Sequence, residues 1–223
     1  MDKIGGAIHS ACAYSTTSGT QILYGMLFLL LILNFAISWF NAWSVGRVWI
    51  ESKMIGGLFR MTVWCGAIMS ACGFTWVYIA LLAILAQSFQ WLPARYIEGI
   101  FSLGYLVIIL PLLGSGLGIT ASSWAQFWRQ KNLINGGIAA WNTYAQISNI
   151  VSAVRFVPEA IGNVFSAFKG DDEEDNRALL LMLAVVLVAV GAGVMTARAI
   201  ILATARKSSQ TVLSELQTQH AAP

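Results

Sequence analysis

Three groups of residues have side chains whose types and spacing could carry chemistry. The first is a stripe of sulfur: Met61, Cys65, Met69 and Cys72 recur every three or four residues, which places them on one face of a helix. Thioether and thiolate sulfur are ligands that Cu(I) prefers, so the stripe is compatible with a copper site. Met and Cys are also ordinary apolar packing residues, and we expect these four to pack against a neighbouring helix instead.

The second group is the acidic run Asp171–Asp175. A calcium loop spaces its oxygen ligands at alternate positions around a glycine, and contiguous acids lack that spacing. Asp175 or Asn176 is placed to cap a helix that begins here, because negative charge is favourable at the positive end of the helix dipole. We therefore expect a helix start here and no metal site.

The third group consists of the two histidines, His9 and His220, which lie at opposite ends of the chain. With that separation we expect neither bis-histidine haem ligation within a helix bundle nor histidine-based acid–base catalysis. The sequence also contains no paired catalytic carboxylates, no glycine-rich phosphate loop and no serine elbow. We expect a protein that is not an enzyme and that binds no cofactor.

The elements that would position these side chains are predicted to be membrane helices. Asp, Glu, Lys and Arg are absent from four stretches: Ile22–Trp43, Met61–Gln87, Gly99–Trp128 and Ala178–Ala197. A helix needs about 20 apolar residues to cross a hydrocarbon core of roughly 30 Å, and each stretch is long enough. The chain is 57% hydrophobic and 10% charged, a composition that favours lipid as its surroundings. We predict an all-α polytopic membrane protein with four transmembrane helices plus an amphipathic interfacial helix.

The spans divide the chain into five expected segments. These are a polar N-terminal segment (1–21), spans one to three (22–128, with spans at about 22–43, 61–87 and 99–128), an amphipathic connection with an acidic end (129–177), a fourth span (178–205) and a polar tail (206–223). Between spans one and two, Ser44–Arg60 has the pattern of a short surface helix, and Gly56 and Gly57 supply the turn that follows. A short link around Pro93 makes spans two and three adjacent and antiparallel.

The connection before the fourth span is predicted to form the amphipathic helix, bent at Pro158. Apolar residues recur at steps of three and four, with Gln146, Asn149 and Arg155 on the opposite face. Such a helix lies on the bilayer, covers the chain's own spans or docks on a partner subunit, and its few charges argue against binding by lipid electrostatics alone. The predicted partner-docking face comprises Ile147, Val151, Val154, Ile161, Phe165 and Phe168.

Small and polar residues within the spans predict helix packing or, alternatively, a pore. Asn34 is an amide in mid-span that is expected to bond to a neighbouring helix. Leu110–Gly118 contains Pro111 and several glycines, so the third span could kink or unwind there and bind a solute through its backbone. Close packing is the favoured interpretation. The residues concerned are Asn34, Gly66, Ser70, Gly73, Pro111, Gly114, Ser115, Gly116, Gly118, Gly191 and Gly193.

These features predict a non-catalytic integral membrane subunit of a larger assembly, such as secretion or conjugation machinery or another bacterial or viral membrane complex. The alternative is a small channel or transporter for a neutral solute or a weakly held ion, with its site at the broken third span. The expected partners are the lipid bilayer and other membrane subunits or further copies of the chain. The scattered bases provide no arm for nucleic acid.

The distribution of bases predicts an orientation in the membrane, which we expect to be a bacterial inner membrane. Cytoplasmic loops are enriched in Lys and Arg. With four spans, the bases near span ends are more numerous on the side opposite the termini, so both termini are expected outside the cytoplasm. The larger set is Arg47, Lys53, Arg60, Arg129, Lys131 and Arg177, and the smaller set is Lys3, Arg95, Arg206 and Lys207.

Overall fold

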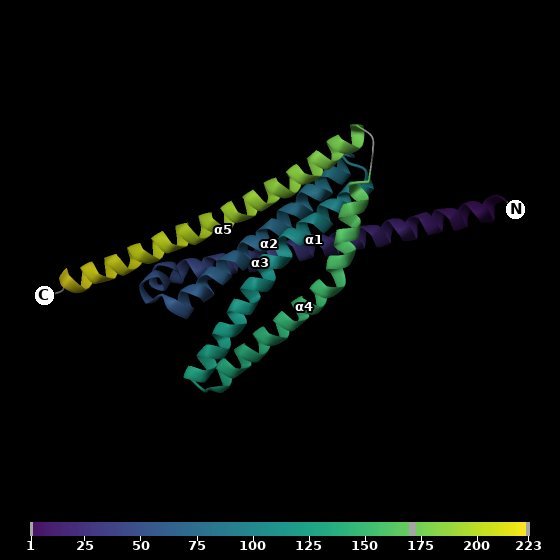
Figure 1. The fold of residues 1–223 in the computed structure, drawn as a ribbon. Coiled ribbons are helices and arrows are strands. Elements are labelled where there is room, and N and C mark those ends of the chain that lie inside the picture. The colour runs from purple at the N-terminus through teal and green to yellow at the C-terminus, as the bar shows by residue number, and fades with distance from the viewer. Residues whose placement is uncertain (1, 170–172, 222–223) are drawn as a thin grey trace.

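Five helices make up the computed structural model, which describes the backbone of residues 2–169 and 173–221 and the side chains of residues 26–93, 96–169, 176–212 and 214. In chain order they are α1 (Asp2–Ile55), α2 (Gly57–Ser88), α3 (Ala94–Arg129), α4 (Leu133–Ala167) and α5 (Glu173–Ala221) (Figure 1). No strand occurs in these residues, so the predicted all-α class is confirmed.

All five helices are long and apolar enough to cross a membrane. The shortest candidate span has 30 residues, which at 1.5 Å per residue extend about 45 Å, more than the roughly 30 Å of a hydrocarbon core. The chain is therefore a multi-pass membrane protein. The five candidate spans are Met26–Ile55, Gly57–Ser88, Tyr96–Arg129, Leu133–Ala167 and Asn176–Val212.

Consecutive helices run antiparallel, so their connections alternate between the two ends of the bundle (Figure 1). α2 lies at the centre and contacts α1, α3 and α5, while α1 and α5 also pack against each other. α4 packs chiefly against α3, with which it forms the outer hairpin of the molecule. The α1–α2 and α3–α4 turns thus lie at one end, and the α2–α3 and α4–α5 connections at the other.

Residues with special backbone properties set the turns. Gly56 and Gly57 have φ of 67° and 56°, which glycine adopts without steric cost, and they separate α1 from α2 where the sequence predicts a turn. The short link from α2 to α3 ends at Pro93, directly before the first turn of α3. In the α3–α4 turn, the side chain of Asn132 accepts a hydrogen bond from the Asn135 N–H at 2.7 Å and so caps α4.

Several helices extend further than the sequence patterns predict. Ser44–Arg60 is not a separate surface helix, because α1 continues through it to Ile55 and no proline precedes Gly56. The expected polar segment 1–21 belongs to α1 from Asp2 onward, and the expected tail 206–223 continues α5 as far as Ala221. The segment 110–118 is helical throughout, so the third span is unbroken: Pro111 removes one backbone donor without unwinding α3.

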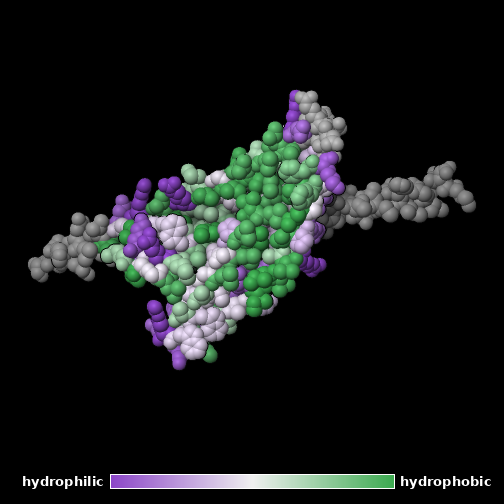
Figure 2. All heavy atoms as spheres, viewed as in Figure 1, coloured by the Kyte–Doolittle hydropathy of each residue, from purple (hydrophilic) through white to green (hydrophobic). Residues whose placement is uncertain are grey.

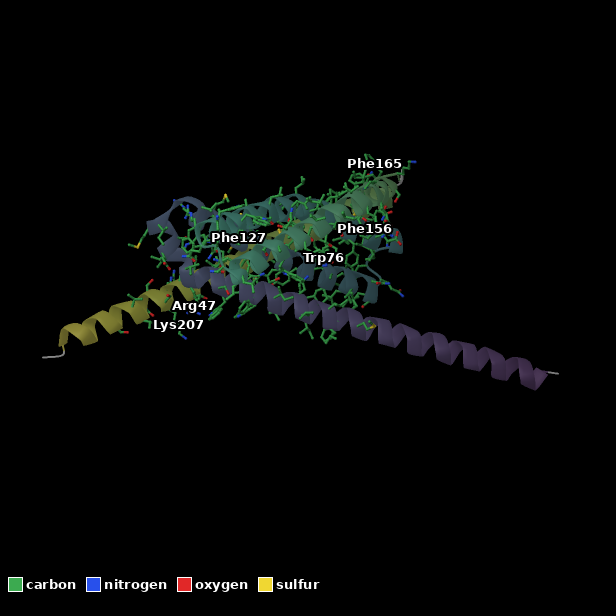
Figure 3. The ribbon with its side chains drawn as sticks, turned by 90° about the horizontal axis from the view of Figure 1, so that it is seen from below. Arg47, Trp76, Phe127, Phe156, Phe165 and Lys207 are labelled. Atoms are coloured by element: carbon green, nitrogen blue, oxygen red, sulfur yellow. The ribbon has the colours of Figure 1, made fainter. Side chains whose placement is uncertain are left out.

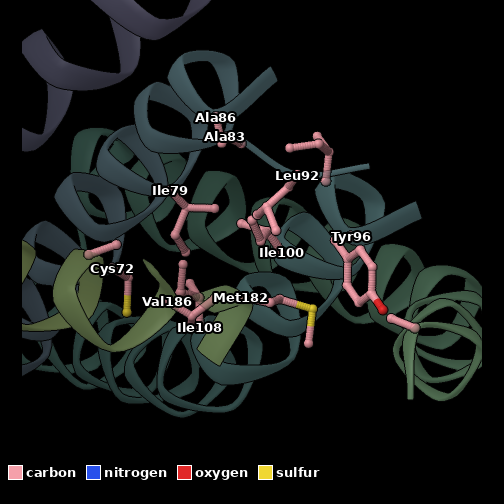
Figure 4. Packing of buried hydrophobic residues seen from close by; sticks show 13 residues of the cluster. Cys72, Ile79, Ala83, Ala86, Leu92, Tyr96, Ile100, Ile108, Met182 and Val186 are labelled. Atoms are coloured by element: carbon pink, nitrogen blue, oxygen red, sulfur yellow. The ribbon is translucent and has the colours of Figure 1, made fainter. Parts of the chain in front are cut away.

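The core lies where α2, α3 and α5 meet (Figure 4). Its fully buried side chains include Ile79, Tyr96, Ile100 and Met182. A second cluster around Phe74 joins α1, α2 and α5. Many other large apolar side chains are exposed, and they form an apolar band between two hydrophilic ends of the molecule (Figure 2). Lipid tails cover such a band without cost, whereas water would not.

The polarity of α4 is the reverse of that of an amphipathic helix in a water-soluble protein. Its predicted docking face is exposed at all six positions, with Val154 73% exposed. Small residues let membrane helices approach closely while apolar residues face the lipid tails, so this distribution is typical of a lipid-facing helix. The buried positions on the opposite side are small or polar: Asn135, Ala139, Gln146, Ala153, Ala160 and Ala167.

Candidate functional site

Five of the predicted packing glycines lie at helix crossings, where an added Cβ would come within 3 Å of an atom of another helix. Gly114 and Gly191 differ from these five, because nothing lies within 4 Å of a Cβ placed on either. The crossings involve several helix pairs, so these residues stabilise the whole bundle instead of forming one surface. The neighbours that a Cβ would meet are Val45 for Gly66, Ser38 for Gly73, Gln146 for Gly116, Cys65 for Gly118 and Thr75 for Gly193.

The predicted polar packing residues mostly bond within their own helices. Ser70 and Ser115 are buried and donate to the backbone carbonyls of Gly66 and Leu112. The side-chain carbonyl of Asn34 accepts from Ser38 Oγ in the same helix at 3.3 Å, and a Cβ on Gly73 of α2 would lie 3.3 Å from that carbonyl oxygen. Asn34 therefore contacts a neighbouring helix but does not hydrogen-bond to it.

Cys65 and Cys72 of the sulfur stripe are buried, whereas Met61 is exposed. Cys65 faces Gly118 of α3, and Cys72 belongs to the core cluster; both thiols are free. Within the described part of the chain, no group of three His, Cys, Asp or Glu residues is placed to hold a metal ion. The side chains of His9, His220 and the acidic run 171–175 lie outside the described residues.

Hydrogen bonds between side chains and their neighbours join α4 to α3 along most of its length. They begin near the α3–α4 turn and extend to the last turns of α4. Because α4 is tied to α3 at both ends, the two helices follow the same path through the molecule. The bonds are Trp124 Nε1 to Thr143 Oγ1 (2.9 Å), Asn142 Nδ2 to Ser123 Oγ (2.6 Å), Thr120 Oγ1 to the Asn142 carbonyl (3.2 Å), Gln146 Nε2 to the Leu113 carbonyl (3.1 Å) and Asn163 Nδ2 to Ser102 Oγ (3.2 Å).

Uncharged polar side chains from four helices line a cleft of about 420 Å³ between α1, α2, α3 and α4. We name it the polar cleft; it has no acidic, basic or histidine residue in its lining. A second cavity of about 360 Å³ shares Asn41 and Met69 with it and extends to Asn34 and Tyr105. The polar residues of the polar cleft are Asn41, Ser44, Thr62, Thr120, Asn142, Gln146 and Asn149.

Several polar groups in these two cavities lack hydrogen-bond partners. Gln146 is only 4% exposed, and its Oε1 has no partner among the described residues; the same is true of the Tyr105 hydroxyl. The side-chain amides of Asn41 and Asn149 are half-buried, and among the described residues they make no hydrogen bond. A buried polar group without a partner costs about 1–3 kcal/mol, and lipid tails supply no replacement. The polar cleft therefore presents hydrogen-bonding groups that the described residues leave unused.

The polar side chains of the polar cleft are amides and hydroxyls, which can bind a ligand or partner through hydrogen bonds. Amides and hydroxyls both donate and accept hydrogen bonds, but none of them exchanges protons readily near neutral pH. The cleft is therefore suited to a neutral hydrogen-bonding group.

The polar cleft is not among the sites predicted from the sequence, although a signal for it is present there. Asn34, Asn41 and Ser44 lie on one face of α1, and Gln146 and Asn149 lie on one face of α4. What the sequence does not show is that these two faces, from helices distant in the chain, line one space.

Comparison with protein-family models, with curated proteins and with solved structures finds no match to this chain.

Proposed function

We propose that this chain is a non-catalytic integral membrane subunit that assembles with another membrane helix through the polar cleft. The observation that carries the proposal is a set of side-chain groups without hydrogen-bond partners among the described residues: the amides of Asn41 and Asn149 and the Oε1 of Gln146. Asn41 lies halfway along Met26–Ile55 and Asn149 halfway along α4, at a depth where lipid offers no hydrogen bond. A partner helix that carries Asn, Gln, Ser or Thr would satisfy them.

The helices in the described part of the chain do not supply the hydrogen bonds that these amides lack. α1 packs against α2 and α5, whereas α4 packs chiefly against α3, so the two helices that carry the free amides are held apart. The exposed apolar face of α4 gives a weaker reason for a partner, because lipid tails cover it equally well. The polar cleft is thus the better candidate for a contact with a partner or with a second copy.

Association of the solubilised chain should depend on the cleft amides. In a mild detergent the wild-type protein is expected to have a mass well above one 24.2 kDa chain plus its micelle. Each polar contact between membrane helices contributes about 0.6–2 kcal/mol, so Asn41→Leu combined with Asn149→Leu should weaken association roughly tenfold or more. Light scattering coupled to size exclusion, at several protein concentrations, measures the change.

The matched control is Ser148→Leu, because Ser148 is exposed, adjoins Asn149 and does not line the cleft. This variant should associate like the wild type. A monodisperse single chain with no co-purifying partner would contradict the proposal, as would equal dissociation of the control.

A second candidate function is a channel or transporter for a neutral solute, with its site in the polar cleft. The observation that favours it is that the polar cleft and the second cavity are adjacent: they share Asn41 and Met69 and have no charged lining residue. Because α3 is helical throughout residues 110–118, an unwound backbone in that segment does not supply the site. Permeability of reconstituted vesicles to small neutral solutes, above that of empty vesicles, would favour this function.

We also propose that α4 is a fifth span instead of a surface helix. Hydrogen bonds join α4 to α3 between Thr143 and Asn163. If α3 crosses the membrane, α4 therefore crosses it beside α3. Its exposed apolar face lies in the same apolar band as those of the other helices (Figure 2). Five spans put the two termini on opposite sides of the membrane, whereas four spans put them on the same side.

The charges of the chain support five spans with the C-terminus in the cytoplasm. Arg47 and Lys207 lie at one end of the bundle and Phe165 at the other (Figure 3). The cytoplasmic ends of membrane proteins are enriched in Lys and Arg. The end with Arg47 receives eight of the 13 bases: Arg47, Lys53, Arg60, Arg129, Lys131, Arg198, Arg206 and Lys207.

A further inference from the structure

An apolar groove of about 560 Å³ runs between α1, α2, α3 and α5 and has two cations, Lys53 and Arg198, in its lining. We propose that this groove, which we name the lipid groove, binds one anionic phospholipid, with an acyl chain in the groove and the phosphate at Lys53 and Arg198. Its volume lies within the range of about 300–1,000 Å³ that is usual for ligand sites. Its apolar lining includes Ile68, Val107, Ile108, Pro111, Val190 and Val194.

The length of the lipid groove matches one leaflet of a bilayer. Its lining extends from Trp64 to Thr75 on α2 and from Val190 to Leu202 on α5. At 1.5 Å per residue these segments are about 16 Å and 18 Å long, close to half of a roughly 30 Å hydrocarbon core. An acyl chain that follows α2 from Trp64 would therefore end near the bilayer midplane, beside Thr75.

The polar end of the groove has the features of a headgroup site. Lys53 Nζ lies 5.9 Å from the centre of the Trp49 ring, and the rings of Trp49 and Trp64 are 5.2 Å apart. Tryptophan prefers the headgroup level of a membrane, so this pair places the end of the groove there. Neither Lys53 nor Arg198 forms an ion pair within the described part of the chain. A lipid phosphate supplies the missing negative charge.

The two cations of the lipid groove favour an anionic phospholipid over a neutral lipid or a partner helix. A neutral lipid would fill the apolar part equally well but would leave two cations without a counter-charge. A partner helix would need acidic residues at the level of Lys53 and Arg198, and the apolar contacts give such a helix no advantage over lipid tails. The lipid groove shares no lining residue with the polar cleft, so this proposal is independent of the proposed function.

Binding of two lipids with identical acyl chains tests the proposal. The full-length chain, purified in detergent, is titrated with phosphatidylglycerol or with phosphatidylcholine, and native mass spectrometry measures the dissociation constant of each. Phosphatidylglycerol is expected to bind roughly tenfold or more tightly, because two bases face its headgroup. In the Lys53→Gln/Arg198→Gln variant that preference should fall to about onefold, while weak binding of both lipids remains.

The Arg47→Gln/Lys131→Gln variant is the matched control. Arg47 Cζ lies 5.0 Å from the Trp43 ring and Lys131 Nζ lies 5.4 Å from the Trp128 ring, so the control removes equal charge from similar settings outside the groove. It should keep the lipid preference. Equal wild-type affinity for the two lipids would overturn the proposal, and so would an unchanged preference in Lys53→Gln/Arg198→Gln or an equal loss in the control.

A variant that fills the groove separates the acyl contribution from the headgroup contribution. Val194→Trp keeps both cations and places a large ring in the groove lining. It should weaken the binding of both lipids, whereas the charge variant changes only their ratio. Glycerophosphoglycerol, which has the headgroup without acyl chains, should fail to displace the bound lipid. Displacement by this soluble headgroup would show an anion site on the surface and would overturn the assignment of the groove.

Discussion

Replacing Gly193 by valine is expected to force α5 away from α2 and to lower the stability of the bundle more than any other single substitution considered. A Cβ on Gly193 would lie 2.6 Å from the backbone nitrogen of Thr75 and 2.8 Å from its Cα. These are main-chain atoms of a helix, so they cannot rotate out of the way. Overpacking a core usually costs about 1–3 kcal/mol, and we expect Gly193→Val to reach or exceed the upper value.

Gly191→Val is the control for this prediction, because it is the same substitution two residues away on the same helix. Nothing lies within 4 Å of a Cβ on Gly191, so its effect should stay within about 0.5 kcal/mol. Thermal unfolding in detergent, followed by the loss of monodisperse protein, compares the two variants. Adding Thr75→Ala should not restore Gly193→Val, because the backbone atoms remain. Similar losses for the two valine variants would show that the close approach is not responsible.

The contrast between Gly191 and Gly193 shows what sequence can predict about membrane helix packing. Both glycines are expected to pack, since small residues in spans usually do. Only the structure shows that Gly193 meets α2 while Gly191 points to open space. The same holds for Gly116, which faces Gln146, and Gly114, which faces nothing. Composition identifies positions where helices are able to approach, but the rotation of each helix decides which of them do.

The number of helices was harder to predict than their class. Four charge-free stretches indicate membrane helices directly, and Gly56 and Gly57 mark a turn because both need positive φ. The sequence predicts an amphipathic interfacial helix at α4 because apolar residues recur at steps of three and four, with Gln146, Asn149 and Arg155 on the opposite face. Its segment from Asn132 to Val154 is nevertheless free of charge and longer than the roughly 20 residues of a span. The amides that lower its hydropathy are the residues that bond to α3 or line the polar cleft.

Asn132 and Asn135 mark the start of α4, but their spacing indicates a helix start only in combination with the charge-free stretch beside it. The side chain of Asn132 caps the helix, and Asn135 Nδ2 donates to the Gln130 carbonyl at 3.0 Å, which closes the turn from α3. An Asn three residues before another Asn is not specific by itself. Next to the end of a charge-free stretch, it marks the point where one membrane helix ends and the next begins.

Labelling of single cysteines is expected to place residues 130 and 169 on opposite sides of the membrane. The background is a chain with Cys12→Ser, Cys65→Ala and Cys72→Ala, into which Gln130→Cys or Lys169→Cys is introduced. If α4 crosses, a membrane-impermeant maleimide applied to intact cells should label position 169 nearly completely and position 130 only after permeabilisation. If α4 lies on the surface, the two positions share one side and label alike.

Two further cysteine positions test the same topology: one near the C-terminus and one positive control. With five spans Ser209→Cys near the C-terminus should be protected in intact cells, whereas with four spans it should be labelled, because the termini then share one side. Gln90→Cys in the α2–α3 link is outside in both topologies, so it reports that labelling works. The eight bases at the end with Arg47 give the physical reason for this orientation, since they favour the cytoplasmic side. Labelling of both 130 and 209 in intact cells, with 169 protected, would reverse the proposed orientation while keeping five spans.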